Sequence, residues 1–98
     1  MREVSDATFE AEVVAAPQPV LVDFWAPWCA PCERIEPTLA ALPLEVVRLD
    51  VDENPLTASR YGVLTLPTVI LFESGEPRAS VVGARGRGHF QRAFATWL

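Results

Sequence analysis

The chain has 98 residues, half of them hydrophobic, which suits one domain over residues 1–98 with a single core. Its formal net charge of −5 at pH 7 argues against general binding to nucleic acid. The first six residues hold neither a basic nor an apolar signal region, and no apolar stretch reaches the length of a membrane span, so we expect a soluble, cytoplasmic protein with no membrane partner.

The N-terminal part of the chain predicts a helix followed by a strand. Ser5 or Asp6 can cap the helix, and Pro17 ends it because proline has no backbone N–H to donate. Residues 20–25 form an almost continuous apolar run, which is typical of a strand buried on both faces.

A second helix and a second strand come next. Residues 30–42 predict a helix that accommodates Pro31 in its first turn and that Pro37 should kink. Residues 45–51 predict a strand. Strand, helix and strand form a βαβ unit, so the two strands are expected to be parallel.

The remainder predicts a short helix, a hairpin and a last helix. Asn54 is expected to cap the short helix, which Gly62 stops. Strands over residues 68–73 and 78–83 flank a four-residue turn, as in a β-hairpin. The last helix, over residues 88–98, should bury Phe90, Phe94, Trp97 and Leu98. Together the elements predict an α/β fold: a central mixed β-sheet, made of the βαβ unit and the C-terminal hairpin, with helices on both faces.

The only two cysteines, Cys29 and Cys32, follow the buried strand and stand at the expected start of a helix. Unpaired N–H groups and the macrodipole at a helix N-terminus favour a thiolate, and Cys29 is placed to be that thiolate. Cys32 is close enough to attack a mixed disulfide formed at Cys29 and to close a small ring. The pattern predicts two-electron thiol–disulfide exchange through a Cys29–Cys32 disulfide.

Two other uses of such a pair stay open from the spacing alone. A closed zinc site needs four ligands, and besides the cysteines the chain offers only His89, so we expect no metal. A purely structural disulfide usually closes a long loop, whereas this ring is short and restricts the unfolded chain little. The spacing therefore favours the redox pair over both alternatives.

A series of motifs over roughly residues 5–98 resembles the thioredoxin family. They are Trp28-Cys29-Ala30-Pro31-Cys32 after a buried strand, an Asp-x-Asp-x-Asn-Pro segment at 50–55, Tyr61-Gly62 leading to Pro67-Thr68, Ser74-Gly75, and Val82-Gly83. The resemblance implies the thioredoxin-like fold, with the sheet and helices described above.

The resemblance also implies a role for each residue near the cysteines. Cys29 would be the attacking nucleophile and Cys32 the buried resolving thiol, with Ala30 and Pro31 tuning how easily the disulfide is reduced. Asp23 would take the proton from Cys32. Burial in an apolar strand should raise the pKa of Asp23 toward neutrality. The alternative for Asp23 is a structural carboxylate bonded to backbone.

A substrate groove beside the sulfurs is implied in the same way. The family pattern implies a cis bond before Pro67, although X-Pro bonds are usually trans. Thr65 and Leu66 would bind an extended client by strand-like backbone hydrogen bonds. Trp28 would be an exposed apolar wall of this groove, and Gly83 would line it.

Three positions depart from the family pattern. Ala30 replaces the usual glycine between the cysteines and stiffens the turn. Glu33 stands where many members carry a basic residue, and its carboxylate should oppose thiolate formation. Arg48 stands where a lysine is common; because arginine keeps its proton, Arg48 should hold a positive charge near Asp23 and limit the rise of the Asp23 pKa.

The function expected from the residues and the resemblance is that of a general protein-disulfide reductase. Its partners would be client proteins that contain disulfides and a thioredoxin-reductase-type flavoprotein that draws on NADPH. It would hold no cofactor and act as a monomer. The alternatives are a disulfide oxidase or isomerase, and a thioredoxin-fold binding or assembly module with dispensable thiols.

Overall fold

The computed structural model describes residues 1–98 and is built on one five-stranded β-sheet. The strands are β1 (Arg2–Val4), β2 (Val20–Trp25), β3 (Glu45–Asp50), β4 (Thr68–Glu73) and β5 (Glu76–Val82). Their order in the sheet is β1-β3-β2-β4-β5. β1, β3 and β2 run parallel, whereas β4 is antiparallel to β2 and β5 to β4. The predicted mixed sheet with a βαβ unit and a hairpin is confirmed.

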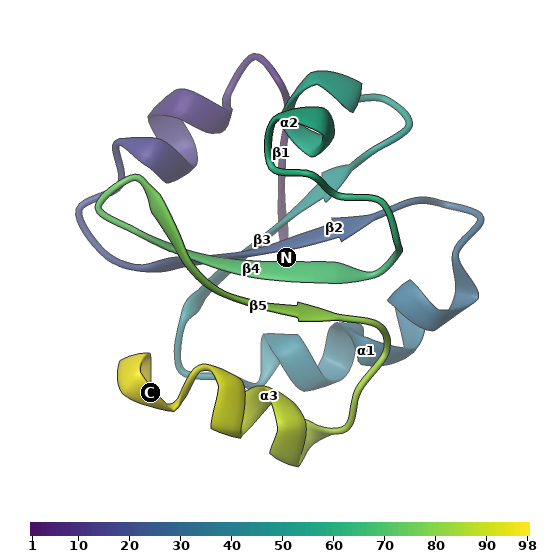
Figure 1. Ribbon diagram of the computed structural model, residues 1–98, viewed down its shortest axis with the longest axis vertical. Helices are drawn as coiled ribbons and strands as arrows, with labels where there is room; N and C mark the ends of the chain where they lie inside the picture. Colours follow the sequence, from purple (N-terminus) through teal and green to yellow (C-terminus); the bar gives the residue numbers. More distant parts are fainter.

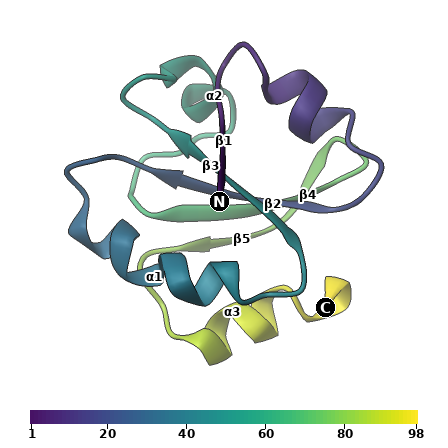
Figure 2. The same ribbon diagram turned by 180° about the vertical axis from the view of Figure 1, so that it is seen from behind.

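Helices cover both faces of this sheet. They are the π-helix η1 (Glu10–Val14), α1 (Ala30–Ala40), α2 (Pro55–Arg60), α3 (Arg87–Ala93) and the 3-10 helix η2 (Ala95–Trp97). α1 and α3 lie on one face, with η1 and α2 on the other (Figure 1). Figure 2 shows the same layers from behind. None of these helices has the length and apolar character needed to cross a membrane.

The central strand β2 divides its side chains between the two layers. Val22 and Phe24 join the core beneath η1 and α2, whereas Leu21 packs with α1 and α3. Because successive side chains of a strand point to opposite faces, Asp23 lies on the same side as Leu21, facing α1. The strand that leads into the cysteines thus also places a carboxylate beneath their helix.

The N-terminal strand β1 was not predicted from the sequence. It has only three residues, and Val4 alone among them is buried, so it shows no alternating pattern to recognise. Its partner is β3, and the register sets Glu3 opposite Arg48. The strand therefore brings a carboxylate to the helix-α1 side of the sheet.

The predicted helix caps are partly wrong. Ser5 accepts the N–H of Phe9 at its carbonyl (2.9 Å) and that of Thr8 at its Oγ (3.2 Å), but the element that follows is only the five-residue η1. Asp6 instead caps α2 from a distant part of the chain, where its carboxylate accepts the N–H groups of Leu56 (3.2 Å) and Thr57 (2.8 Å). Asn54 makes no side-chain cap of its own.

The hairpin turn and the last helix are both shorter than predicted. The turn consists of Ser74 and Gly75 alone, both with positive φ (53° and 80°), so β5 starts at Glu76. The predicted burial of Phe90 and Phe94 is confirmed, but Trp97 is only half-buried and Leu98 is 45% exposed. The helix ends at Ala93, and the tighter 3-10 turn that follows carries the last residues off the apolar face.

Candidate active site

The two cysteines form a disulfide at the start of α1. Cys29 is the N-cap of the helix, in an extended backbone conformation, and its Sγ accepts the N–H of Cys32 at 3.2 Å. Pro31 fits within the first turn, where its missing N–H costs no helical hydrogen bond. Because the free N–H groups of a helix start favour negative charge, this geometry stabilises a thiolate on Cys29 in the reduced protein.

The disulfide is packed in a small apolar cluster. Cys29 and Cys32 are both buried, at 4% and 2% exposure, and they share the cluster with Ala26. The side chains of Trp25, Val51 and Leu66 pack against it. The predicted groove residue Leu66 is thus in contact with the sulfur cluster.

Pro67, which directly follows Leu66, is hydrogen-bonded to Gly83. The Leu66–Pro67 peptide bond is cis, and the carbonyl of Pro67 accepts the N–H of Gly83 at 2.8 Å. Gly83 has φ = 95°, a left-handed backbone conformation that favours glycine. The loop before Pro67 is held by the Thr68 hydroxyl, which donates to the carbonyl of Thr65 at 2.5 Å.

Trp28 stands at the rim of the site as the most exposed of the three tryptophans. It is 70% exposed, and its indole Nε1 donates to Asp52 at 2.7 Å. The backbone N–H of Asp52 in turn donates to the Asp50 carboxylate at 2.9 Å, which fixes the backbone at Asp52. The sequence did not predict this role for Asp52, although its Asp-x-Asp spacing lies within a motif already recognised.

Asp23 is a buried carboxylate on the face of the sheet covered by α1. It is 1% exposed, and its Oδ1 has no hydrogen-bond partner. The pKa of Asp23 is raised from 3.8 to about 7, mainly by burial; Glu36 and Glu3 contribute to the rise, and Arg48 opposes it. A carboxyl group with this pKa exchanges protons near neutrality.

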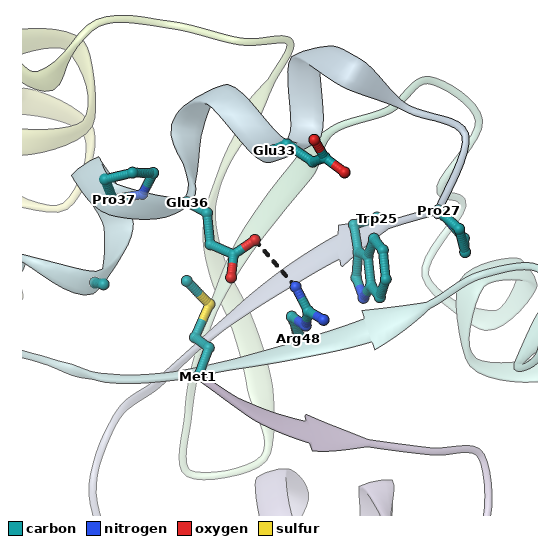
Figure 3. A pocket seen from close by; sticks show the side chains of 8 residues that line it. Met1, Trp25, Pro27, Glu33, Glu36, Pro37 and Arg48 are labelled. Carbon is teal, nitrogen blue, oxygen red and sulfur yellow. Dashed lines mark hydrogen bonds and ion pairs between the residues drawn. The ribbon is translucent and has the colours of Figure 1, made fainter.

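Arg48 lies at the edge of a cavity of about 640 Å³ that opens between α1 and the sheet (Figure 3). Its guanidinium donates to Glu3 at 2.6 Å and to Glu36 at 3.0 Å. The guanidinium carbon lies 4.1 Å from the centre of the Trp25 ring, in cation–π contact. Arg48 therefore acts on Asp23 in the expected direction, but two carboxylates compete for its charge.

Glu3 and Glu36 were missed in the sequence. Glu36 stands four residues after Cys32, which places both on the same face of a helix, so this spacing could have indicated it. Glu3 depends on the pairing of β1 with β3, for which the sequence holds no comparable signal. Glu33, flagged as a departure, lines the same cavity.

No group of three or more histidine, cysteine, aspartate or glutamate side chains is arranged to hold a metal ion. His89, the only histidine, is exposed and stacks edge-on with Phe90. Near Asp23, Arg48 pairs with both Glu3 and Glu36, and the charges of these three residues act on the pKa of Asp23.

Comparison with known proteins gives a consistent result. Residues 1–96 match the family model described as Thioredoxin. The chain is 43% identical over 97 residues to a thioredoxin of Streptomyces clavuligerus, covering 94% of this chain and 91% of that protein. It is 45% identical over 96 residues to a thioredoxin of Mycobacterium tuberculosis strain H37Rv, covering 92% and 83%. A bifunctional thioredoxin reductase/thioredoxin of Mycobacterium leprae matches at 45% over 96 residues, covering 92% of this chain and 21% of that protein.

Proposed function

This chain belongs to the thioredoxin family and is a thiol–disulfide oxidoreductase, and we propose that it reduces protein disulfides with Cys29 as nucleophile and Cys32 as resolving thiol. The observation that carries this assignment is the Cys29–Cys32 disulfide at the N-terminus of α1, with the Cys32 N–H donating to Cys29 Sγ. That hydrogen bond favours the thiolate on Cys29 over the one on Cys32.

The reaction proceeds in two exchanges. The Cys29 thiolate attacks one sulfur of a client disulfide; a mixed disulfide forms, the client S–S bond breaks and the first client thiolate leaves. The Cys32 thiol then loses its proton and attacks Cys29 Sγ, which closes the Cys29–Cys32 disulfide and releases the second client thiolate. Two electrons pass from the dithiol to the client, whose two thiolates take up protons.

Asp23 is proposed as the acceptor of the Cys32 proton. It faces α1 from β2, and with a pKa of about 7 it is present in both protonation states under physiological conditions. A general base whose pKa lies near the working pH is deprotonated often enough to accept a proton and is still basic enough to draw one from the thiol. Ala30 and Pro31, between the cysteines, set the stiffness of the turn and so tune the ease of reduction.

The client is proposed to bind at the loop that carries Pro67. Thr65 and Leu66 offer backbone groups for strand-like pairing, and Leu66 already packs against the sulfur cluster. Trp28 supplies an exposed apolar wall, and Gly83 lies beside Pro67 without a side chain to block the approach.

The electrons are proposed to come from a thioredoxin-reductase-type flavoprotein. The relative from Mycobacterium leprae is named as a thioredoxin reductase and a thioredoxin in one chain, which supports a partner of this kind.

We further propose that residues 1–98 act as one domain and as a monomer in the cytoplasm. One continuous sheet with a core on each face supports the single domain, and catalytic use of both cysteines suits a reducing compartment.

A redox titration against glutathione tests the direction of the reaction. We expect a reduction potential near the roughly −270 mV of thioredoxins, far below the roughly −120 mV of a strong disulfide-forming oxidase. A value at the oxidising end would contradict the reductase and favour the oxidase alternative. A pair that does not equilibrate with glutathione at all would favour a binding module with idle thiols.

A further inference from the structure

Glu36 is carried by the cysteine helix, and its charge acts on the buried carboxylate Asp23. It belongs to α1 and is partly exposed at the cavity, where Figure 3 shows its carboxylate directed at Arg48. The two groups are 3.0 Å apart. Glu36 therefore holds a residue whose charge acts on Asp23.

Arg48 has a carboxylate opposite it on each neighbouring strand, Glu3 on β1 and Asp23 on β2, but pairs only with Glu3 of the two. Asp23 and Arg48 are directly opposite each other in the register of β2 and β3. The ion pairs of Arg48 nevertheless go to Glu3 and Glu36, and its guanidinium lies against the Trp25 ring. A guanidinium paired with Asp23 would hold that carboxyl group ionised and weaken it as a base.

We propose that Glu36 is a positioning residue for the resolving step: together with Glu3 it holds the Arg48 guanidinium at the cavity mouth and away from Asp23. The proposal rests on the role assigned above to Asp23 as acceptor of the Cys32 proton. Glu36 then raises the pKa of Asp23 in two ways. It keeps the Arg48 guanidinium from pairing with Asp23, and its own negative charge disfavours ionisation of Asp23.

The charged groups that face Asp23 from the surrounding elements are few. α1 contributes Glu36, β3 contributes Arg48 and β1 contributes Glu3. On the other side, β4 places Val69 opposite Asp23, and α3 contributes Phe90 and Phe94 to this layer. In the oxidised protein the titration of Asp23 therefore depends on one cation and two carboxylates, of which Glu36 is the one carried by the cysteine helix. Once the disulfide is opened, the Cys32 thiol on the same helix is a further titratable group.

The test is the replacement Glu36→Gln, read on the resolving step and on Asp23 itself. Carboxyl NMR should show Asp23 titrating at lower pH than in the parent protein. Release of a thiol from a mixed disulfide preformed at Cys29 should shift its pH midpoint in the same direction. Its plateau above that midpoint should fall roughly twofold, because a less basic carboxylate is a weaker proton acceptor.

Two matched variants separate this effect from a change in net charge or fold. Glu45→Gln removes a carboxylate that also pairs with an arginine, Arg2 at 2.9 Å, and should leave both readouts unchanged. Glu36→Asp keeps the charge and should restore much of the parent profile. If Glu36→Gln moves the Asp23 titration no more than Glu45→Gln does, the proposal is overturned.

A double variant distinguishes failure of this proposal from failure of the proposed function. In an Asp23→Asn background, Glu36→Gln should have no further effect on the pH profile, and a shift that persists there overturns the proposal. If Asp23→Asn slows the resolving step but Glu36→Gln leaves its midpoint in place, only the role of Glu36 is wrong. If Asp23→Asn leaves the step unchanged, the role of Asp23 fails and the proposal falls with it.

Discussion

Insulin reduction by this protein should fall to the rate of dithiothreitol alone when Cys29 is replaced by serine. The helix N-terminus stabilises a thiolate at position 29, but a serine hydroxyl there is not ionised near neutral pH. The variant therefore has no nucleophile to attack the client disulfide. The measurement is the rate of insulin precipitation with dithiothreitol as the electron source, for the parent protein and the Cys29→Ser variant.

Circular dichroism is the control for that variant, because its spectrum should keep the parent shape while activity is lost. A second control, Ser80→Ala, changes an exposed residue on the outer strand β5 and should keep full activity. Turnover by Cys29→Ser at the parent rate would remove Cys29 from the mechanism.

Replacing Asp23 with Asn should stabilise the oxidised protein by roughly 2–4 kcal/mol at pH 8 and by little at pH 4. The pKa of Asp23 is raised from its ordinary 3.8 to about 7, which corresponds to about 4 kcal/mol at the upper limit. Part of this gain is lost because the new amide is itself buried. Urea unfolding of both proteins at the two pH values measures the difference.

The sign of this effect follows from proton binding. Between pH 3.8 and about 7 the folded state holds the Asp23 proton while the unfolded state releases it. The stability of the parent protein therefore falls as the pH rises through that window, and the contribution of Asp23 to that fall is absent in the variant.

The same variant should release clients more slowly near neutral pH, because Cys32 loses its proton acceptor. Asp52→Asn makes the same chemical change at an exposed carboxylate and should show no stability gain that grows with pH. If Asp23→Asn is no more stable than the parent at pH 8 and releases clients at the parent rate, Asp23 is an ordinary structural carboxylate.

The elements of the sheet interior could be predicted from the sequence because their side chains are apolar in long runs. β2 and β4 are buried on both faces along almost their whole length, and α1 shows its apolar stripe despite Pro37. β1 carries no such signal, since only Val4 is buried. The cap of α2 by Asp6 joins residues about fifty positions apart and depends on the finished fold.

The candidate site divides in a similar way. The spacing of Cys29 and Cys32 indicates their chemistry without a structure, and the cis bond before Pro67 was expected only from the family resemblance. The pairing of Arg48 with Glu3 and Glu36 could not be predicted, because it needs both the register of β1 against β3 and the packing of α1 on the sheet. Residues with a recognisable spacing or a match to the family pattern were therefore found, whereas Glu3 and Glu36, which reach the site through tertiary contacts, were not.

The order of the two cysteines is tested most directly by trapping the mixed disulfide. Reduced Cys32→Ser and reduced Cys29→Ser would each be mixed with one disulfide-containing client, and the covalent adduct measured by intact mass before and after reduction. We expect Cys32→Ser to accumulate an adduct that reduction removes, because Cys29 attacks and nothing nearby resolves it. If Cys29→Ser accumulates as much adduct as Cys32→Ser, the assignment of Cys29 as nucleophile and Cys32 as resolving thiol is contradicted.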